Sequence, residues 1–180
     1  ATTPSPAVAA GRASSGVVAA PDAVVAAAER GEEEAVLAWL DSGGRVNATY
    51  ERGGVSGATL LMGAALHGHE RVVELLSRRS ADVNLQTSDG DTALMFAAAN
   101  GHKRVVELML RNGAEVNLQR SDGWTALIDA AQEGHERVVD LLLQRGAEIN
   151  LQDRNGYTAL ILAAGKGPDR LVELLTRQGA

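Results

Sequence analysis

Four histidines are the residues of this sequence best suited to bind a metal ion or to transfer a proton. They are His67, His69, His102 and His135, and the last three lie 33 residues apart. A metal site or a catalytic site needs its side chains to converge on one point, whereas a constant spacing puts each histidine at the same place in successive units. We therefore interpret the three periodic histidines as structural hydrogen-bonding residues of a repeated loop. His67 is outside this pattern, and we expect it to face a groove.

Other sequence motifs for chemistry are missing. The Asp-Gly pairs at 89–90 and 122–123 lack the ligand spacing of a calcium loop and are typical of tight turns. No GxxxxGK phosphate loop, no GxSxG motif and no cysteine is present. The sequence thus predicts no catalytic residues, no metal and no cofactor, and we expect that the protein is not an enzyme.

The charge pattern argues against nucleic acid as a partner, and the distribution of apolar residues argues against a transmembrane segment. The 180 residues carry a formal net charge of −6, and phosphate binding needs clustered Lys and Arg. Arg104, Arg137 and Arg170 recur every 33 residues but have acidic neighbours, which predicts an exposed outer face with ion pairs. No apolar run approaches the roughly 20 residues that a transmembrane helix requires.

The histidine spacing is part of an internal repeat that covers most of the chain. Segments 81–113 and 114–146 are identical at 21 of 33 positions, and 147–179 matches 114–146 at 18 of 33. The helical half continues upstream through 57–80, since Thr59, Thr92, Thr125 and Thr158 keep the same spacing. The extended turn that precedes this helical half, which we call a finger, is longer than the later ones, and its four extra residues must fall within 48–57. Such a period indicates a stack of similar units.

Each unit reads as two helices followed by an extended turn. In segment 114–146, Thr125 can cap the first helix by accepting a first-turn N–H bond. Gly134 and Gly146 can end the two helices in a conformation that other residues resist. The second helix, 135–145, carries an apolar stripe at helical spacing, formed by Val138, Val139, Leu141 and Leu142. One helix pair cannot bury this stripe alone, so each unit must stack on the next.

Residues 22–180 resemble ankyrin repeats. The resemblance rests on "GDTALMFAAANGHKRVVELMLRNGAEVN", "GWTALIDAAQEGHERVVDLLLQRGAEIN" and "GYTALILAAGKGPDRLVELLTRQGA". It implies an all-α solenoid of about five stacked helix pairs with short β-hairpin fingers, and a non-catalytic protein-binding module. The chain departs from the family's usual Thr-Pro-Leu-His, which appears here as Thr-Ala-Leu followed by Met95, Ile128 or Ile161. Pro168 and Thr176 also break the pattern in the last unit, where a more polar helix suits an end cap.

The expected domain organisation has two parts. Residues 1–21 are rich in Ala, Ser, Thr and Pro and cannot bury enough apolar area to fold, so we expect a flexible arm. Asp22 is a candidate N-cap for the first helix after this arm. The repeat domain is expected over 22–180, divided into a capping helix pair at 22–43 and repeats at 44–80, 81–113, 114–146 and 147–180.

The positions that vary between repeats are the candidate binding residues. The resemblance implies that finger tips and first helices line a concave binding surface. Trp124 and Tyr157 follow the turn glycines of adjacent repeats, and aromatic residues are enriched in interface hot spots. We predict that both anchor a partner; the alternative is that they pack locally on their own repeats. The other predicted binding residues are His67, Asp89, Asp91, Asn100, Asp122, Asp129, Glu133, Arg154 and Lys166.

The acidic members of this set predict the chemistry of the partner. Asp129 takes a place held by Phe96 and Leu162 in the neighbouring repeats, and together with the other carboxylates it would make the middle of the groove acidic. We expect a partner protein with basic groups near an apolar anchor.

Two other functions stay open. The chain could be a permanent accessory subunit of a larger complex, with the arm 1–21 lying on that complex. It could also be a regulatory fragment of a longer enzyme. We expect an intracellular protein of the cytoplasm or nucleus, or of an organelle interior after removal of a presequence.

Overall fold

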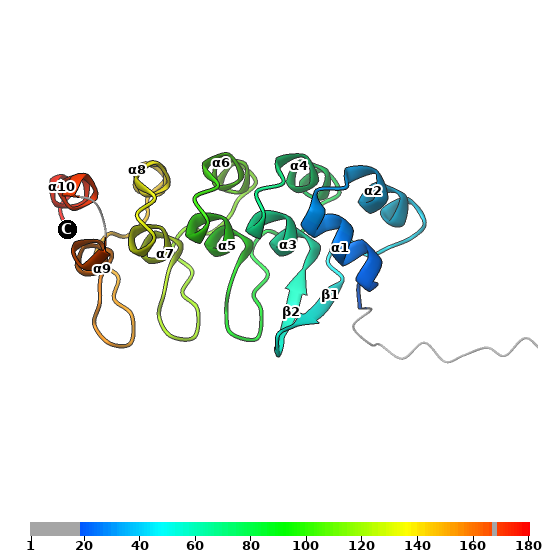
Figure 1. Cartoon of the computed structure of the whole chain (residues 1–180), viewed down its shortest axis with the longest axis horizontal. Helices are drawn as coiled ribbons and strands as arrows, with labels where there is room; N and C mark the ends of the chain where they lie inside the picture. The colour runs from blue at the N-terminus through cyan, green and yellow to red at the C-terminus, as the bar shows by residue number, and fades with distance from the viewer. Residues whose placement is uncertain (1–18, 167–168) are drawn as a thin grey trace, which may run out of the picture.

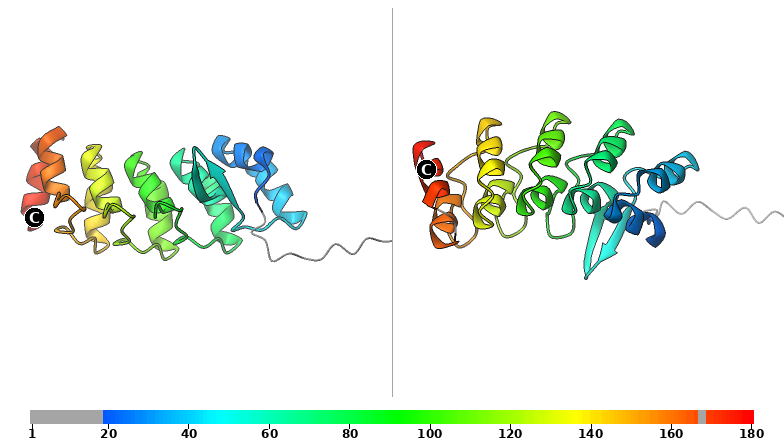
Figure 2. Two further views of the ribbon diagram at one scale, coloured as in Figure 1. Left: turned by 90° about the horizontal axis from the view of Figure 1, so that it is seen from below. Right: turned by 45° about the horizontal axis from the view of Figure 1, so that its top comes forward.

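The computed structural model describes residues 19–166 and 169–180, which form two layers of short helices (Figure 1). The first helix of each pair lies in one row and the second in the other, with the fingers projecting from the first row. Successive pairs stack side by side in both further views (Figure 2). The helices are α1 (Asp22–Arg30), α2 (Glu33–Asp41), α3 (Leu60–Leu66), α4 (Glu70–Arg78), α5 (Ala93–Ala99), α6 (Lys103–Arg111), α7 (Ala126–Gln132), α8 (Glu136–Gln144), α9 (Ala159–Lys166) and α10 (Asp169–Arg177).

The first helices begin where the repeated threonines predict. The side-chain oxygens of Thr59, Thr92 and Thr125 accept hydrogen bonds from backbone N–H groups three residues later, at 3.3, 3.3 and 3.2 Å. At α1 the predicted cap is wrong. Pro21 occupies the N-cap, and Asp22 is the first helical residue. Its carboxylate there still interacts favourably with the helix dipole.

The core lies between the two layers and between neighbouring pairs. Ala64, Ala97, Ala130 and Ala163 are fully buried at the same place in successive first helices, where a small side chain lets the layers approach closely. Valines and leucines of the second helices fill the remaining space. Stacking therefore buries the apolar stripes, as the sequence predicts.

The periodic histidines bind one repeat to the one before it. The Nε2 atoms of His69, His102 and His135 lie 2.7, 3.0 and 3.0 Å from backbone carbonyl oxygens of the preceding repeat. Each ring also covers a glycine with positive φ; a Cβ atom on Gly68, for example, would lie 2.7 Å from the His102 ring. These contacts confirm the structural interpretation of the three histidines.

The first finger is a β-hairpin, whereas the others are turns in the described part of the chain. Strands β1 (Thr49–Arg52) and β2 (Val55–Thr59) pair antiparallel, and the four extra residues of this finger lengthen it. The tips are linked in series: the N–H groups of Ser88, Ser121 and Arg154 each donate to a carbonyl of the preceding finger at 2.8 Å.

Residues just before α1 join the packed structure. Ala19 forms a parallel bridge with Thr49, and the Ala20 N–H donates to the Thr49 carbonyl at 3.0 Å. Ala20 is buried. Residues 19 and 20 belong to the expected arm, and they are thus held against β1. Residues 1–18 lie outside the described structure.

The second helices carry the ion pairs predicted for the outer face. Arg104 lies 2.8 Å from Glu107 on its own helix and 3.9 Å from Glu70 on α4. Arg104 and Glu70 are exposed and Glu107 is half-buried, so each pair contributes little to stability. In residues 19–166 and 169–180, no helix has the length and apolar character needed to cross a bilayer.

Candidate functional site

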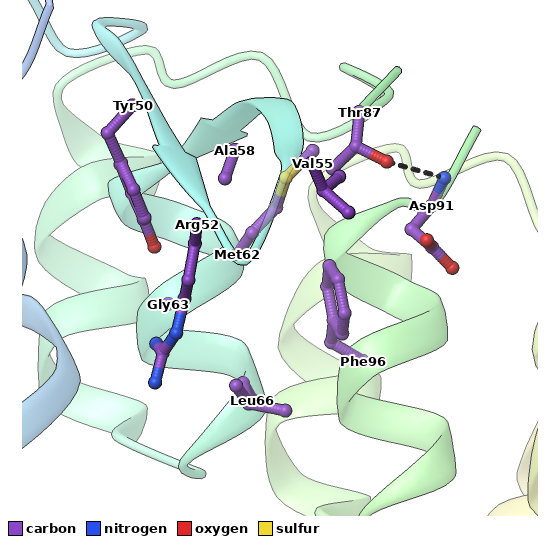
Figure 3. A pocket seen from close by; sticks show the side chains of 10 residues that line it. All are labelled: Tyr50, Arg52, Val55, Ala58, Met62, Gly63, Leu66, Thr87, Asp91 and Phe96. Atoms are coloured by element: carbon purple, nitrogen blue, oxygen red, sulfur yellow. Dashed lines mark hydrogen bonds between the residues drawn. The ribbon is translucent and has the colours of Figure 1, made fainter. Parts of the chain in front are cut away.

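An apolar cavity of about 190 Å³ lies on the finger side of the first helices, between the hairpin and α5 (Figure 3). Met62, Gly63 and Leu66 of α3 line one part of it, and Phe96 of α5 lines another. The hairpin and the next finger complete the lining with Tyr50, Arg52, Val55, Ala58, Thr87 and Asp91. We call this feature the hairpin cavity.

Two departures from the repeat produce the hairpin cavity. Gly63 stands where the later repeats carry Phe96, Asp129 and Leu162, so no side chain fills this place. The lengthened hairpin then brings the Tyr50 hydroxyl so close that a Cβ atom on Gly63 would lie 2.9 Å from it. Burial raises the pKa of Tyr50, which keeps this hydroxyl neutral at physiological pH.

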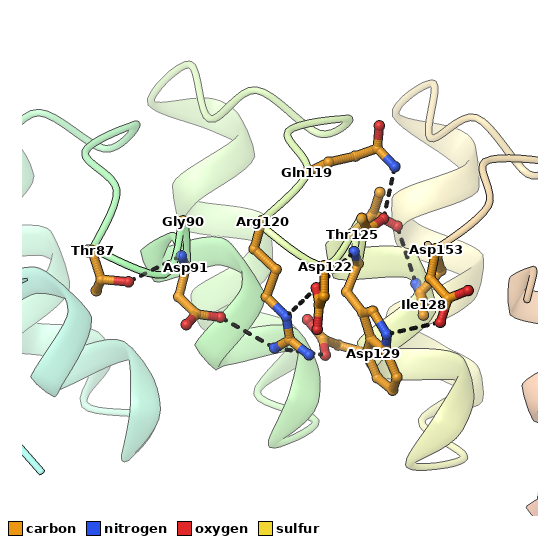
Figure 4. Close-up of polar contacts among 12 residues, drawn as sticks. Thr87, Gly90, Asp91, Gln119, Arg120, Asp122, Thr125, Ile128, Asp129 and Asp153 are labelled. Atoms are coloured by element: carbon orange, nitrogen blue, oxygen red, sulfur yellow. Dashed lines mark hydrogen bonds and ion pairs between the residues drawn. The ribbon is translucent and has the colours of Figure 1, made fainter. Parts of the chain in front are cut away.

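A polar cluster extends from one wall of the cavity along the same surface (Figure 4). The Arg120 guanidinium lies 2.8 Å from Asp122, 3.2 Å from Asp91 and 3.7 Å from Asp129. It also lies over the Trp124 ring, 4.8 Å from the centroid, which is a cation–π geometry. We call Arg120 and these three carboxylates the Arg120 cluster.

Arg120 reaches this position because it does not cap its own turn. The equivalent Thr87 accepts the Asp91 N–H at 3.1 Å, and the equivalent Asp153 accepts the Asn155 and Tyr157 N–H groups at 2.8 Å each. An arginine side chain cannot accept these bonds. Its guanidinium instead bridges the finger before it and its own first helix.

Asp129 is the least solvated member of the cluster. The residue is 6% exposed, and its Oδ2 atom is buried without a hydrogen-bond partner in the described chain. Burial raises the pKa of this carboxyl to about 7, although the nearby Arg120 charge acts in the opposite direction. For Asp122, burial is outweighed by the hydrogen bonds from Arg120 and the Trp124 N–H, which lower its pKa. One carboxylate of the cluster is therefore firmly charged, and another titrates near neutrality.

Asp91 connects the two features. It lines the hairpin cavity and also accepts a hydrogen bond from Arg120. Three carboxylates share a single guanidinium in the cluster, so the surface beside the apolar cavity is acidic whether or not Asp129 holds its proton.

The two predicted aromatic anchors differ in their surroundings. Trp124 is half-buried, and its Nε1–H donates to Asp153 of the next finger at 3.2 Å. Its ring thus takes part in packing between repeats. Tyr157 is 45% exposed, and its hydrogen bonds in the described chain are those of its backbone, from its N–H to the Asp153 carboxylate and from the Asp153 N–H to its carbonyl. A role of either ring in binding stays a prediction.

The remaining predicted residues lie along the same side of the stack but outside the cluster. Asp89 and Arg154 are exposed at finger tips, and His67 and Glu133 are exposed at the ends of α3 and α7. Asn100 is exposed, but its side-chain amide donates to the Phe96 carbonyl at 2.9 Å, which completes the end of α5. Lys166 ends α9, and its side chain lies outside the described residues.

The repeated helix pairs have a recognised family signature. A model described as ankyrin repeats (3 copies) matches residues 23–120, 61–153 and 108–180. The chain belongs to the ankyrin repeat family. No curated protein gives a significant match to it. Ankyrin repeats are protein–protein interaction modules, and the all-α solenoid with a short hairpin agrees with the fold that the sequence predicts.

Sequence reasoning missed the residues that shape this ankyrin surface most. Arg120 was detectable, because it interrupts a column in which Thr87 and Asp153 can both cap a turn. The hairpin cavity had only an indirect signal, the coincidence of Gly63 with a lengthened finger. In the described residues of this ankyrin stack, no group of three His, Cys, Asp or Glu side chains is arranged to hold a metal ion.

Proposed function

We propose that this protein binds a partner protein without catalysis, through the surface formed by the hairpin cavity and the Arg120 cluster. The observation that carries the proposal is the apolar cavity placed directly beside an excess of carboxylates. A repeat that only needed to stack would not require either feature, because later repeats fill the place of Gly63 with the side chains of Phe96 and Leu162.

The partner segment should carry one apolar side chain and a nearby basic one. An apolar cavity of about 150 Å³ can hold a benzene molecule, so the hairpin cavity is large enough for one such side chain. Burying that side chain contributes about 1.5–3 kcal/mol. A basic group over the Arg120 cluster contributes less, about 1 kcal/mol at an exposed site, but selects the partner by charge.

A selection experiment tests this pairing. The immobilised protein would be used to select from a displayed library of short random peptides. We expect the selected peptides to combine an aliphatic or aromatic residue with Lys or Arg. Enrichment of acidic peptides, or of no sequence class at all, would contradict the proposal.

The repeat provides a matched pair of variants for the same peptides. Leu66→Gln makes the cavity lining polar, and the same column already holds Gln132, so the substitution suits the fold. We expect it to weaken the best peptide about tenfold, which corresponds to about 1.4 kcal/mol. Ala99→Gln places the same side chain one repeat further, and its effect should stay below about twofold, or about 0.4 kcal/mol. If both variants weakened binding equally, the cavity would have no specific role in binding the peptide.

The accessory-subunit role is the second candidate, and interface size distinguishes it. Permanent complexes usually bury more than about 2,000 Å², whereas a peptide-sized contact in this cavity buries less. A partner that stays bound after Leu66→Gln but is lost when residues 1–18 are deleted would favour that role.

A further inference from the structure

The chain that precedes α1 is anchored to a wall of the hairpin cavity. Ala19 forms a bridge with Thr49 at the start of β1, and the Ala20 N–H donates to the Thr49 carbonyl. The next residue of β1, Tyr50, lines the cavity (Figure 3). Residues 1–18 are therefore attached at a fixed point beside the surface that we propose for binding a partner.

The sequence of residues 1–18 has the chemistry expected of that partner. It contains a single basic residue, Arg12, and no acidic residue. Its branched apolar side chains are the valines at positions 8, 17 and 18. Val8 is four residues from Arg12, and four residues of extended chain span at most about 14 Å. The segment thus combines an apolar side chain with a nearby positive charge.

The surface has places for both groups at that spacing. Asp91 lines the hairpin cavity, and its carboxylate lies 3.2 Å from the Arg120 guanidinium, which is 2.8 Å from Asp122 (Figure 4). The Asp122 side chain is 47% exposed, so a second guanidinium can reach it. Because three carboxylates share one cation in the cluster, an excess of negative charge is left for Arg12.

The length of the segment allows these contacts. Val8 lies eleven residues before Ala19 and Arg12 lies seven, which correspond to about 36 and 23 Å of extended chain. Packed helices lie about 8–10 Å apart, so the two steps from α3 to α7 cover roughly 20 Å. Both side chains can therefore reach the surface while Ala19 stays bound to β1. Val17 and Val18 are within two residues of Ala19, so their reach is only about 7 Å.

We propose that residues 1–18 occupy this surface within the same molecule, with Val8 in the hairpin cavity and Arg12 beside Asp91 and Asp122. The inference rests on the proposed function, because the segment then competes with the partner for one site. The tether gives the segment an effective concentration on the order of millimolar, so a weak contact is enough to fill the site. A partner displaces it with a side chain larger than valine, such as leucine or phenylalanine, which fills more of the cavity.

Paramagnetic relaxation tests the intramolecular contact without any partner. The chain has no cysteine, so Thr3→Cys gives a single site for a nitroxide label. We expect the label to raise the relaxation rates of the Leu66 and Phe96 amide protons about threefold more than in the same labelled chain with Val8→Ser and Arg12→Ser, because the tether alone then no longer holds the segment at the cavity. Equal relaxation in both chains would overturn the proposal. The same effect on chains without nitroxide, mixed with labelled ones, would make a second copy the occupant and would also overturn it.

Competition is measured with the best peptide from the selection. If the segment fills the site for about three quarters of the time, the 180-residue chain with Val8→Ser and Arg12→Ser should bind the peptide about fourfold more tightly than the wild type. Val8→Ser alone keeps the charge of the segment, and it should still give a gain of about twofold. Val17→Ser is the matched control near the anchor, and its gain should stay below about 1.5-fold. Equal gains from the two valine variants, or no gain at all, would overturn the proposal.

The two proposals fail separately in these measurements. If the peptide binds the wild type and the variants equally, partner binding stands and the competition by residues 1–18 is wrong. If no peptide binds while the label still acts on Leu66 and Phe96, the intramolecular contact stands and the proposed partner chemistry is wrong.

Discussion

The buried carboxyl of Asp129 makes the stability of the fold depend on pH. An unfolded aspartate loses its proton near pH 3.8, whereas the folded-state pKa of Asp129 is about 7. Between these values the folded protein binds more protons than the unfolded chain, so the free energy of unfolding decreases as the pH rises. The groups that face Asp129 are Arg120, Asp91, Asp122 and Glu133, and only Arg120 favours its charged form. The stabilisation is complete below about pH 4 and is lost above pH 7.

Asp129→Asn should remove this pH dependence. An amide of the same shape carries no charge to desolvate, so we expect the variant to be more stable than the wild type at pH 8, by an amount on the order of a few kcal/mol. The difference should shrink as the pH falls towards 4. Urea unfolding at several pH values measures it, and a difference that grows on acidification would contradict the argument.

Arg120→Ala should be destabilising, and more so at pH 8 than at pH 5. Removing the guanidinium leaves the carboxylates of the cluster without a counterion, and a buried carboxylate without a partner is costly. In the Asp129→Asn background the same substitution should cost less, with a coupling energy on the order of 1 kcal/mol. The four proteins of this double-mutant cycle can be compared by urea unfolding. Additive effects would show that Arg120 does not balance Asp129.

At the scale of elements, the fingers touch through their turn glycines. Gly123 has a φ of +90°, and a Cβ atom there would lie 2.9 Å from the Asp153 Cα atom of the next finger. Gly156 has a similar φ of +81° but has no neighbour within 4 Å. The two glycines thus share the same backbone requirement and differ only in the contact.

Gly123→Ala should therefore cost more stability than Gly156→Ala. Both substitutions strain a left-handed residue, by about 1–2 kcal/mol. Only Gly123→Ala must also displace the backbone of the next finger, including the 2.8 Å bond from the Arg154 N–H to the Asp122 carbonyl. Equilibrium denaturation of the two variants makes the comparison. Equal losses would mean that contact between fingers contributes nothing.

The regular elements could be predicted from the sequence because their causes are local and repeated. Thr125, Gly134 and the valine stripe each act within one turn or one neighbouring unit, so a fixed spacing locates them. The cavity and the cluster depend on side chains from different repeats meeting in space. Tyr50 approaches Gly63 only because the hairpin folds back, and Arg120 spans two repeats. A comparison of equivalent positions in successive repeats shows that Arg120 is unusual, but it does not show which residues Arg120 contacts.

Across the whole molecule, stability should fall towards the last helix pair. A stack is held together by contacts between neighbours, and α9–α10 has a neighbour on one side only in the described chain. The N-terminal pair also has one neighbour but leaves mainly small side chains such as Ala35 exposed. We expect amide exchange to be fastest in α9 and α10 and slowest in α5 to α8, as measured by mass spectrometry on peptic fragments. Fastest exchange in the central helices would contradict nearest-neighbour stacking.

The side-chain contacts from Asp91 through Arg120 to Trp124 and Asp153 join three consecutive fingers. Spreading the fingers would break these contacts, so the stack should resist bending more strongly across these three fingers than elsewhere. Under tension the molecule should lengthen first outside them, while the Arg120 cluster keeps its geometry.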